Sequence, residues 1–218
     1  MVCFSKDVDI LKYEPVLFGE LHLPWQVLVS GTGGTLSGTT FTANDADFVS
    51  AQVSAGQVIN LQSSSALLDG AYEIVSVDST TQLTVSVIRA DSDDDPVAPP
   101  AATDISYRIS TFEPQANEAG LTLTEYFSIR PGDPASEIDV EDVLNTEVLK
   151  RASVFAVVSS VYAMLASKAE DENFWKKSLY YKKLFQRARE RCHLSIDVDS
   201  DGVAEIAKVG SSVRLARD

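Results

Sequence analysis

The most metal-like pattern in the sequence is a run of alternating carboxylates, Asp197-Val198-Asp199-Ser200-Asp201-Gly202. Its spacing matches the first half of an EF-hand calcium loop. Position nine would be Glu205, but position twelve, which must supply a bidentate carboxylate, is Lys208. The flanking residues have the pattern of strands, whereas an EF-hand loop leads into a helix. The pattern therefore favours an acidic hairpin turn, with weak calcium binding as the alternative, and we predict no metal site.

A glycine-rich segment, from Gly31 to Thr39, resembles a phosphate-cradling loop in composition. It lacks the lysine of a P-loop, and it leads into a strand, whereas phosphate loops open a helix. We expect a flexible β-turn there.

The groups that could serve in catalysis are few and isolated. His22 has no cysteine or carboxylate at ligand spacing, and His193 ends a basic helix, where an imidazolium is favourable. No nucleophile-elbow pattern is present, and Cys192 falls on the apolar stripe of a predicted helix. The carboxylates of residues 91–95 lie in a proline-rich loop that we expect to be exposed and mobile, whereas catalysis requires preorganised groups. We therefore predict no catalytic residue, no cofactor and no enzymatic activity.

The elements that would position these residues separate by periodicity. Residues 1–24 carry a helical stripe that Pro15 interrupts, which predicts two short helices or a kinked one. Residues 25–111 contain short β-branched and alternating stretches between Gly and Asp turns, typical of a small antiparallel barrel or sandwich. The strands on either side of the polar turn at residues 78–81 should pair as a hairpin.

Residues 112–193 are predicted to form a helical domain. Carboxylates at 139–142 suit a helix start, and apolar residues then recur at spacings of three and four for roughly 24 residues. A second stripe, from Phe174 to Cys192, predicts another long helix antiparallel to the first. Residues 194–218 predict a β-hairpin or an extended arm. The predicted fold class is α+β: an N-terminal helix, an inserted antiparallel β-barrel or sandwich, a long antiparallel helix hairpin and an extended C-terminal arm.

The charge is distributed unevenly along the chain. The 218 residues hold 18 basic and 32 acidic side chains, and a formal charge of −14 disfavours ordinary nucleic-acid binding. Residues 150–191 hold 10 basic and 4 acidic side chains, a charge of +6, whereas residues 1–149 hold 5 and 23, a charge of −18. A basic segment beside an acidic remainder indicates directed contacts with partners or with other copies, and a solvated helix face is the alternative.

Composition also bears on the compartment. No apolar run approaches the roughly 18 to 20 residues of a membrane span, so we expect no contact with a membrane. The first residues lack the pattern of a secretory signal. Two cysteines cannot form a disulfide framework, which favours folding in the cytosol.

The order of the parts resembles that of a known family. A short N-terminal helix with Tyr13-Glu14-Pro15-x-Leu17-Phe18 precedes the segments Leu36–Thr42, Gly70–Asp78 and Leu83–Val87, which look like β modules of tailed-bacteriophage neck proteins. The stretch from Leu149 to Arg189, followed by an acidic Asp-Gly turn and a basic tail, resembles phage head–tail connector (adaptor) proteins.

This resemblance implies a structural virion protein located at the neck and assembled in the host cytoplasm. It would form a ring, usually of twelve copies, that joins the portal protein to the tail terminator or tail proteins and passes genomic DNA through its lumen without specific binding. In that family a C-terminal arm contacts the portal, which by position assigns that role to Arg214, Leu215 and Arg217.

Charge suggests two further sets of residues. A basic helix requires an acidic neighbour, which residues 1–149 of the next copy supply in a head-to-tail ring. The expected inter-subunit residues are Lys176, Lys182, Lys183, Arg187 and Arg191. Carboxylates lining the lumen would repel DNA phosphates. The candidates are Asp93, Asp94, Asp95, Asp139 and Glu141.

Two other functions are alternatives. A tail terminator or another neck ring would differ mainly in copy number. A capsid decoration or receptor-binding protein would use the β module to bind glycan. The strand region has few aromatic side chains for sugar stacking, and a core would claim several of them: Trp25, Phe41, Phe48, Tyr72 and Tyr107.

Overall fold

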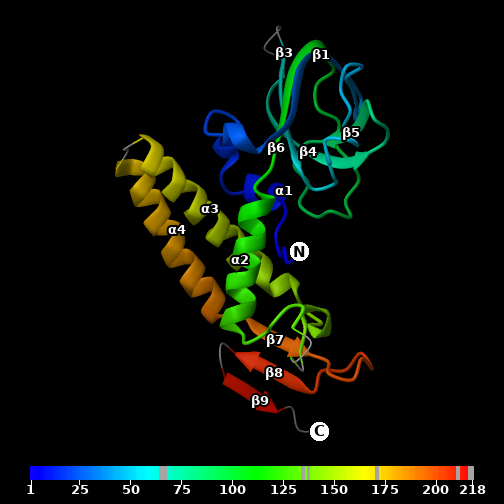
Figure 1. The fold of residues 1–218 in the computed structure, drawn as a ribbon. Coiled ribbons are helices and arrows are strands. Elements are labelled where there is room, and N and C mark those ends of the chain that lie inside the picture. The colour runs from blue at the N-terminus through cyan, green and yellow to red at the C-terminus, as the bar shows by residue number, and fades with distance from the viewer. Residues whose placement is uncertain (64–67, 134–135, 137, 170–171, 210–211, 216–218) are drawn as a thin grey trace. The chain divides into compact units, whose positions relative to one another are not determined.

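The chain divides into two compact units, each with its own hydrophobic core (Figure 1). The barrel unit is Lys6–Phe112, and the helical unit consists of Met1–Ser5 and Glu113–Asp218. The barrel unit is therefore an insertion in the chain of the helical unit. The computed structural model describes residues 1–63, 68–133, 136, 138–169, 172–209 and 212–215.

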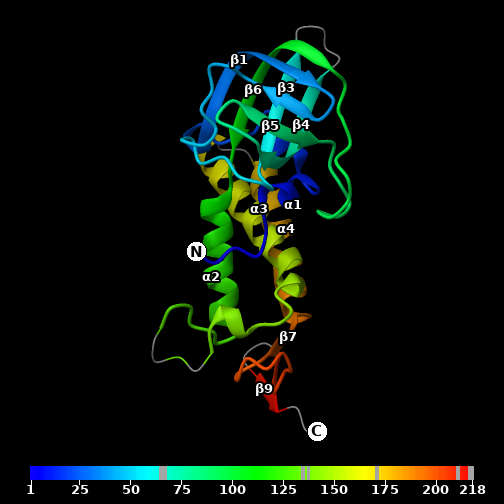
Figure 2. The ribbon, with the colours of Figure 1, turned by 90° about the vertical axis from the view of Figure 1, so that its right-hand side faces the viewer.

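The barrel unit contains a closed barrel of six antiparallel strands in the order β1-β2-β5-β4-β3-β6 (Figure 2). The strands are β1 (Val27–Ser37), β2 (Thr40–Thr42), β3 (Val58–Ser63), β4 (Asp69–Val77), β5 (Gln82–Ser86) and β6 (Ala102–Ser110). The pairing of β4 with β5 confirms the hairpin predicted across residues 78–81. Closure through the β1–β6 pair makes the module a barrel and not a sandwich.

Short helical segments precede the barrel. They are α1 (Asp7–Leu11) and the 3₁₀ turns Pro15–Leu17 and Pro24–Gln26. Because proline has no N–H to donate, it begins a new turn here instead of continuing α1. The Asp7 carboxylate accepts a hydrogen bond from the Phe112 N–H at 2.8 Å, so the first and last residues of the barrel unit lie together.

The glycine-rich segment is mostly strand, and the prediction of a flexible turn there was wrong. Residues 31–35 belong to β1. A Cβ at Gly31 would lie 2.6 Å from the Tyr107 hydroxyl, and one at Gly34 would lie 2.7 Å from the Phe41 ring. Glycine stands at these positions because aromatic rings of the core pack directly onto the strand backbone.

In its described residues, the helical unit contains three long helices and a three-stranded antiparallel sheet. Helix α3 packs against both α2 and α4. Val148 contacts Cys192 and Ser159 contacts Ser178, so α3 and α4 run antiparallel, as the hairpin prediction required. The elements are α2 (Glu113–Tyr126), α3 (Glu147–Ala169), α4 (Glu172–Glu190), β7 (His193–Ile196), β8 (Ile206–Val209) and β9 (Ser212–Leu215).

Two helix starts differ from the sequence prediction. The carboxylates at 139–142 do not begin α3, which starts at Glu147. They form a separate 3₁₀ turn, Val140–Asp142, in which the Asp139 carboxylate accepts a hydrogen bond from the Val140 N–H at 2.6 Å. Helix α2 occupies a segment for which the sequence analysis identified no individual helix.

Strands β7, β8 and β9 form a folded antiparallel sheet, so the hairpin alternative is confirmed for β7 and β8, and these strands are not an extended arm. Leu194 and Ile196 of β7 are fully buried in the core of the helical unit. The Asn145 side-chain amide donates to the His193 carbonyl, and its oxygen accepts from the Ser195 N–H, both at 2.9 Å. The alternation of Leu194 and Ile196 is that of a strand buried on one face, so β7 is part of the core.

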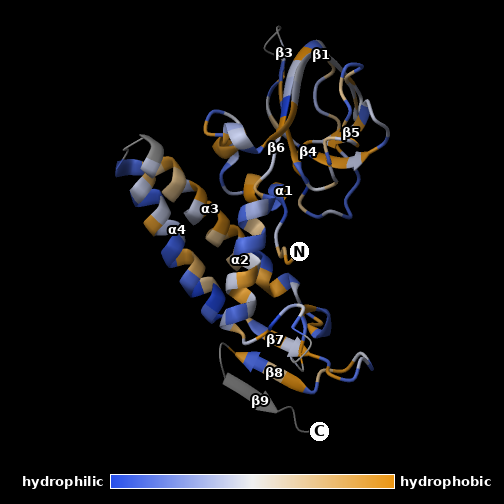
Figure 3. Ribbon diagram, in the orientation of Figure 1, coloured by the Kyte–Doolittle hydropathy of each residue, from blue (hydrophilic) through white to orange (hydrophobic). Residues whose placement is uncertain are grey.

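Helix α3 is the apolar member of the hairpin. Figure 3 shows α4 as largely hydrophilic, whereas α3 carries much of the hydrophobic colour. Contrary to the sequence expectation, Glu147–Ser167 is long and apolar enough to span a membrane by length and composition alone. Half of that window is buried, and Ala152, Val157 and Val161 are fully buried, as in the core helix of a helical bundle.

Candidate functional site

The clearest candidate site is a groove of about 570 Å³ between α3 and α4, near the start of β7. Apolar and basic side chains share its lining. We call it the basic groove. It is lined by Asn145, Val148, Arg151, Phe155, Leu184, Arg187, Ala188, Arg191, Cys192 and His193.

Three exposed arginines give the basic groove its charge. Arg187 lies in the last turn of α4, Arg191 directly follows the end of that helix, and Arg151 comes from α3. The Arg151 guanidinium lies 5.4 Å from the centroid of the Phe155 ring. The salt bridges found in the described part of the chain involve none of these three arginines. Among the residues that the structure describes, no carboxylate therefore forms an ion pair with these guanidinium groups.

Cys192 does not make the basic groove a nucleophilic site. Its thiol donates to the carbonyls of Val148 at 3.2 Å and Ala188 at 3.3 Å. Burial raises the pKa of the Cys192 thiol, so the group stays protonated at neutral pH. What the groove can do is bind: guanidinium groups recognise carboxylate or phosphate, and the apolar side chains accept aliphatic groups.

The structure divides the basic residues predicted to contact another copy. Arg187 and Arg191 both line the basic groove. Lys176 forms an ion pair at 3.1 Å with a carboxylate one turn before it in α4. Lys182 lines a different groove, and Lys183 is exposed on α4 without lining either.

Arg151 is a groove residue that the sequence analysis missed. Its charge belongs to the basic segment, but it is not among the residues predicted to contact another copy. Its place on the helical wheel of α3, one turn before Phe155, was the only available signal, because the α4 residues beside it are more than thirty positions away in the sequence.

A second groove, of about 360 Å³, lies among α2, α3 and α4. Its lining includes the small residues Ala156 and Ala163 together with Trp175, whose side chain is half exposed. Next to them, the Ser159 hydroxyl donates to the Ser178 carbonyl at 3.0 Å and the Ser178 hydroxyl donates to the Ser159 carbonyl at 2.9 Å. These two hydrogen bonds show that α3 and α4 approach closely at Ser159 and Ser178, where both side chains are small.

In the barrel unit, residues 87–98 form an exposed loop that we call the acidic loop. Beneath it, Arg89 and Glu73 are buried and paired at 2.7 Å. Arg89 Nη1 also donates to the carbonyls of Ser92 at 2.7 Å and Asp94 at 2.6 Å. The hydrogen bond with Glu73 raises the pKa of Arg89, which stays charged. The loop is exposed as predicted, but a buried ion pair determines its backbone conformation, which the sequence analysis did not foresee.

The acidic loop combines charge with aliphatic surface. Its candidate lumen residues Asp93, Asp94 and Asp95 are all exposed. Val87 is 41% exposed and Val97 is 56% exposed, and the Val87 N–H donates to the Val97 carbonyl at 2.9 Å. The two ends of the loop are therefore bonded to each other, and apolar side chains stand beside the carboxylates.

The second predicted acidic run has mostly local roles. Besides capping Val140, the Asp139 carboxylate accepts from the Gly132 N–H at 3.3 Å. The Asp142 carboxylate accepts from the Asp139 N–H at 2.7 Å. Glu141 is exposed. Of this run, Glu141 is the residue whose charge is directed to solvent.

The predicted portal contacts lie at the end of the chain. Arg214 and Leu215 belong to β9, which pairs with β8. Arg217 lies outside the residues that the structure describes.

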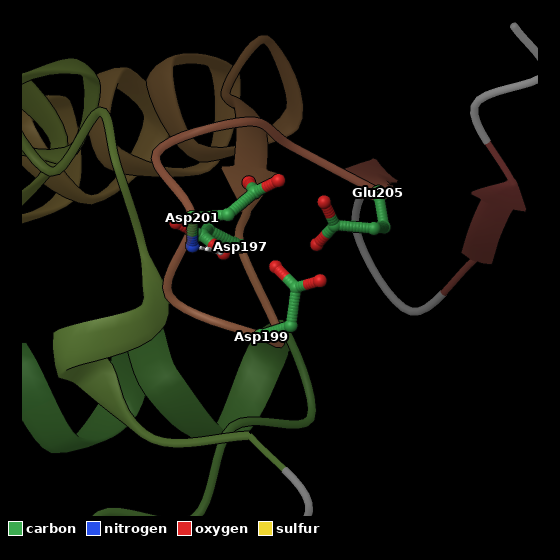
Figure 4. A group of neighbouring side chains, drawn as sticks. All are labelled: Asp197, Asp199, Asp201 and Glu205. Atoms are coloured by element: carbon green, nitrogen blue, oxygen red, sulfur yellow. Dashed lines mark hydrogen bonds between the residues drawn. The ribbon is translucent and has the colours of Figure 1, made fainter.

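The alternating carboxylates gather on the connection between β7 and β8 (Figure 4). Carboxylate oxygens of Asp197, Asp199, Asp201 and Glu205 lie within 4.8 Å of one another. Asp197 accepts from the N–H groups of three successive residues, 200–202, at 2.7, 3.2 and 2.7 Å, which forms the predicted turn. Repulsion, chiefly from Asp201, raises the pKa of Asp199. Exposed carboxylates at this spacing do not by themselves establish a cation site.

Lys208, at the twelfth position of the same motif, has a structural role. Its ammonium donates to the carbonyls of Phe127 at 3.1 Å and Ser128 at 3.3 Å, directly after α2 ends at Tyr126. The side chain is buried, and burial lowers the pKa of Lys208. A bidentate carboxylate cannot stand at this position without removing that contact with the end of α2.

The aromatic residues considered for glycan binding are mostly in the barrel core. Phe41, Phe48 and Tyr107 are buried, and their ring centroids lie 5.3 to 6.3 Å apart. Tyr72 is half-buried and Trp25 is 62% exposed. The barrel therefore offers Trp25 as the most accessible of the five rings.

Comparisons with protein-family models, with curated proteins and with solved structures found no match, so the chemistry of the basic groove and the acidic loop is the ground for a function.

Proposed function

We propose that this protein is a structural component of a tailed-bacteriophage virion, a ring-forming adaptor that joins the portal to the tail. The observation that carries the proposal is the basic groove, whose three exposed arginines belong to a chain with a formal charge of −14. Separated charges of this kind favour binding between copies through two different surfaces. Such a heterologous contact closes into a ring or continues as a fibre.

The net charge also supports passage of DNA through the ring. A lumen lined by carboxylates repels phosphates, so the DNA does not adhere to the wall. In the run at 139–142, Glu141 is the better candidate for such a lining, because the carboxylates of Asp139 and Asp142 already cap backbone N–H groups.

A tail terminator or another neck ring is the nearest second candidate, since it would use the same type of contact. A glycan-binding decoration protein has less support, because the barrel core takes Phe41, Phe48 and Tyr107.

The test is to locate and count the protein in particles produced from the genome that encodes it. Quantitative mass spectrometry and cryo-electron microscopy should find twelve copies at the neck, and deletion of the gene should leave filled heads and tails that do not join. Copies spread over the capsid would replace the proposal with decoration, and a ring of six would replace it with tail termination. Absence of the protein from the particles would reject all three functions.

A further inference from the structure

We propose that the basic groove of one copy receives the acidic loop, residues 87–98, of a second copy. The inference rests on the proposed ring and names the two surfaces that would close it. Because the groove and the loop are different surfaces, each copy would use one of each, and the contact would be head-to-tail.

The first ground is charge. The groove presents three exposed guanidinium groups, on Arg151, Arg187 and Arg191, that form no salt bridge among the described residues. The barrel unit holds 4 basic and 14 acidic side chains, a net charge of −10, and three of its acids are the adjacent exposed residues 93–95. A guanidinium group can donate two parallel hydrogen bonds to one carboxylate. The carboxylates of the acidic loop are therefore suitable partners for the arginines of the basic groove.

The second ground is apolar surface on both sides. Exposed ion pairs alone stabilise little, so a stable contact also requires buried aliphatic groups. In the groove, Val148 is 40% exposed, and Leu184 lines the same groove. Next to the loop carboxylates, Val87, Ile88 and Val97 are 38 to 56% exposed. A groove of about 570 Å³ is within the usual size of binding pockets, which is enough for a few such side chains.

The third ground is the rigidity of the acidic loop. Arg89 holds the carbonyls of Ser92 and Asp94 while its guanidinium pairs with buried Glu73. The free energy lost by removing both charges from water offsets most of the attraction between them, so a buried ion pair adds little to the stability of the fold. It does fix the conformation of an exposed loop before binding, and this reduces the entropy lost on association. Because the acidic loop is already ordered, its contact with a second copy costs less conformational entropy.

Nucleic acid is the other anion that three arginines could bind. The acidic groups of the remaining chain, which bring the total to −14, repel a polyphosphate that approaches the groove. A second copy also carries a net negative charge, but its carboxylates stand at fixed positions, so the loop can enter the groove while the other acidic groups stay away from it. A continuous phosphate backbone cannot do this. The observations therefore favour the second copy.

The experiment uses the full-length chain and two charge-reversed variants. The groove variant carries Arg187→Glu and Arg191→Glu, and the loop variant carries Asp93→Arg and Asp95→Arg, which leave the Asp94 carboxylate on the Asp91 N–H. Matched controls are Arg130→Glu, whose side chain is 77% exposed outside the groove, and Asp69→Arg on the exposed end of β4. Mass photometry and sedimentation velocity at low salt measure the assembly.

Wild type and both controls should form assemblies larger than a monomer, and each variant alone should dissociate at least about tenfold more readily. An equimolar mixture of the two variants should recover assemblies larger than a monomer. In the mixture the intact groove meets the intact loop, and the reversed groove meets the reversed loop, so each contact again joins opposite charges. Assemblies of either variant at wild-type strength, or a mixture that stays monomeric while wild type assembles, would overturn the proposal.

If the wild-type protein is monomeric in solution, disulfide cross-linking tests the contact instead. In a Cys3→Ser background, Asp95→Cys with Arg187→Cys should give a ladder of covalent oligomers on oxidation, whereas Asp95→Cys with Arg130→Cys should not. Absence of the ladder rejects the contact. Binding of a labelled DNA duplex to wild type but not to the groove variant would also reject it, by assigning the groove to phosphate.

The outcomes separate this contact from the proposed function. A neck ring that forms normally with the groove variant alone or with the loop variant alone keeps the adaptor and rejects the contact between groove and loop. A ladder from a protein that is absent from virions keeps the contact and rejects the adaptor.

Discussion

Arg89 shows how a single side chain connects the interior of the barrel with its surface. Its guanidinium pairs with the Glu73 carboxylate of β4 and also donates to two carbonyls of the acidic loop. The side chain is almost entirely buried. The sequence could not reveal this arrangement, because Glu73 and Arg89 lie on different stretches of chain and only the β4–β5 pairing brings them together. The sequence shows that the loop is acidic, but it does not show that the loop backbone has a fixed conformation.

Replacing Arg89 alone should strongly destabilise the barrel. Arg89→Met leaves the Glu73 carboxylate buried without its partner, which should lower the free energy of unfolding by about 3–5 kcal/mol in urea denaturation. The double variant Arg89→Met/Glu73→Met removes both charges and should recover most of this loss, since apolar pairs of similar volume often replace buried ion pairs without cost.

The same double variant separates stability from loop shape. Hydrogen exchange at residues 92–94 should quicken even where global stability is restored, because no donor remains for the Ser92 and Asp94 carbonyls. Unchanged exchange in that segment would show that Arg89 does not hold the loop.

At the level of secondary-structure elements, local patterns were sufficient where one segment determines its own structure. The β4–β5 hairpin and the α3–α4 pair follow from alternation and helical spacing in adjoining residues. Helix α2 was missed because its buried face is built largely from Ala116, Ala119 and Gly120, which give a weak apolar stripe. The glycines of β1 were misread because the reason for them, the rings of Phe41 and Tyr107, lies elsewhere in the sequence.

Helix α2 depends on an element from the other end of the chain. Lys208→Met keeps the aliphatic stem but removes the donor to the Phe127 and Ser128 carbonyls, so it should lower the free energy of unfolding by about 1–3 kcal/mol. Thermal and urea unfolding of the two proteins measure this. An exposed change on α2, Glu118→Gln, is the control and should be nearly neutral.

The pH dependence of that loss has a defined sign. Burial lowers the pKa of Lys208, so between the lowered value and the ordinary 10.5 the unfolded chain binds more protons than the folded chain. The free energy of unfolding of wild type therefore rises with pH in this window through this group, and the deficit of Lys208→Met widens from neutral pH toward pH 10.5. A constant or shrinking deficit would mean that the ammonium is not desolvated.

On the scale of the whole molecule, the chain divides into two compact units, and each contains a cluster of buried apolar side chains. A change of periodicity in the sequence indicates that a β unit interrupts the helical unit. Barrel closure could not be predicted in this way, because it depends on the pairing of β1 with β6, which are distant in sequence. The groove likewise depends on two helices whose register no local pattern determines.

Damage to one core should leave the other intact. Phe41→Ala removes a fully buried ring from the barrel and should lower the stability of that unit by about 3–5 kcal/mol. Hydrogen exchange with mass spectrometry should then show faster exchange in β1–β6, with α3 and α4 as protected as in wild type. Equal loss of protection in both units would mean that they unfold as one.

The hydrogen bond between Asp7 and Phe112 has a consequence for how such a chain can change over generations. It holds the entry and exit of the barrel at one point, so the barrel interrupts its host without separating the two cut ends. A few glycines between Ser5 and Glu113 would bridge the gap if the barrel were removed, and another domain with adjacent termini could take its place. Because the barrel enters and leaves the chain at one point, its exchange for another domain with adjacent termini would need no new connection between the two segments of the helical unit.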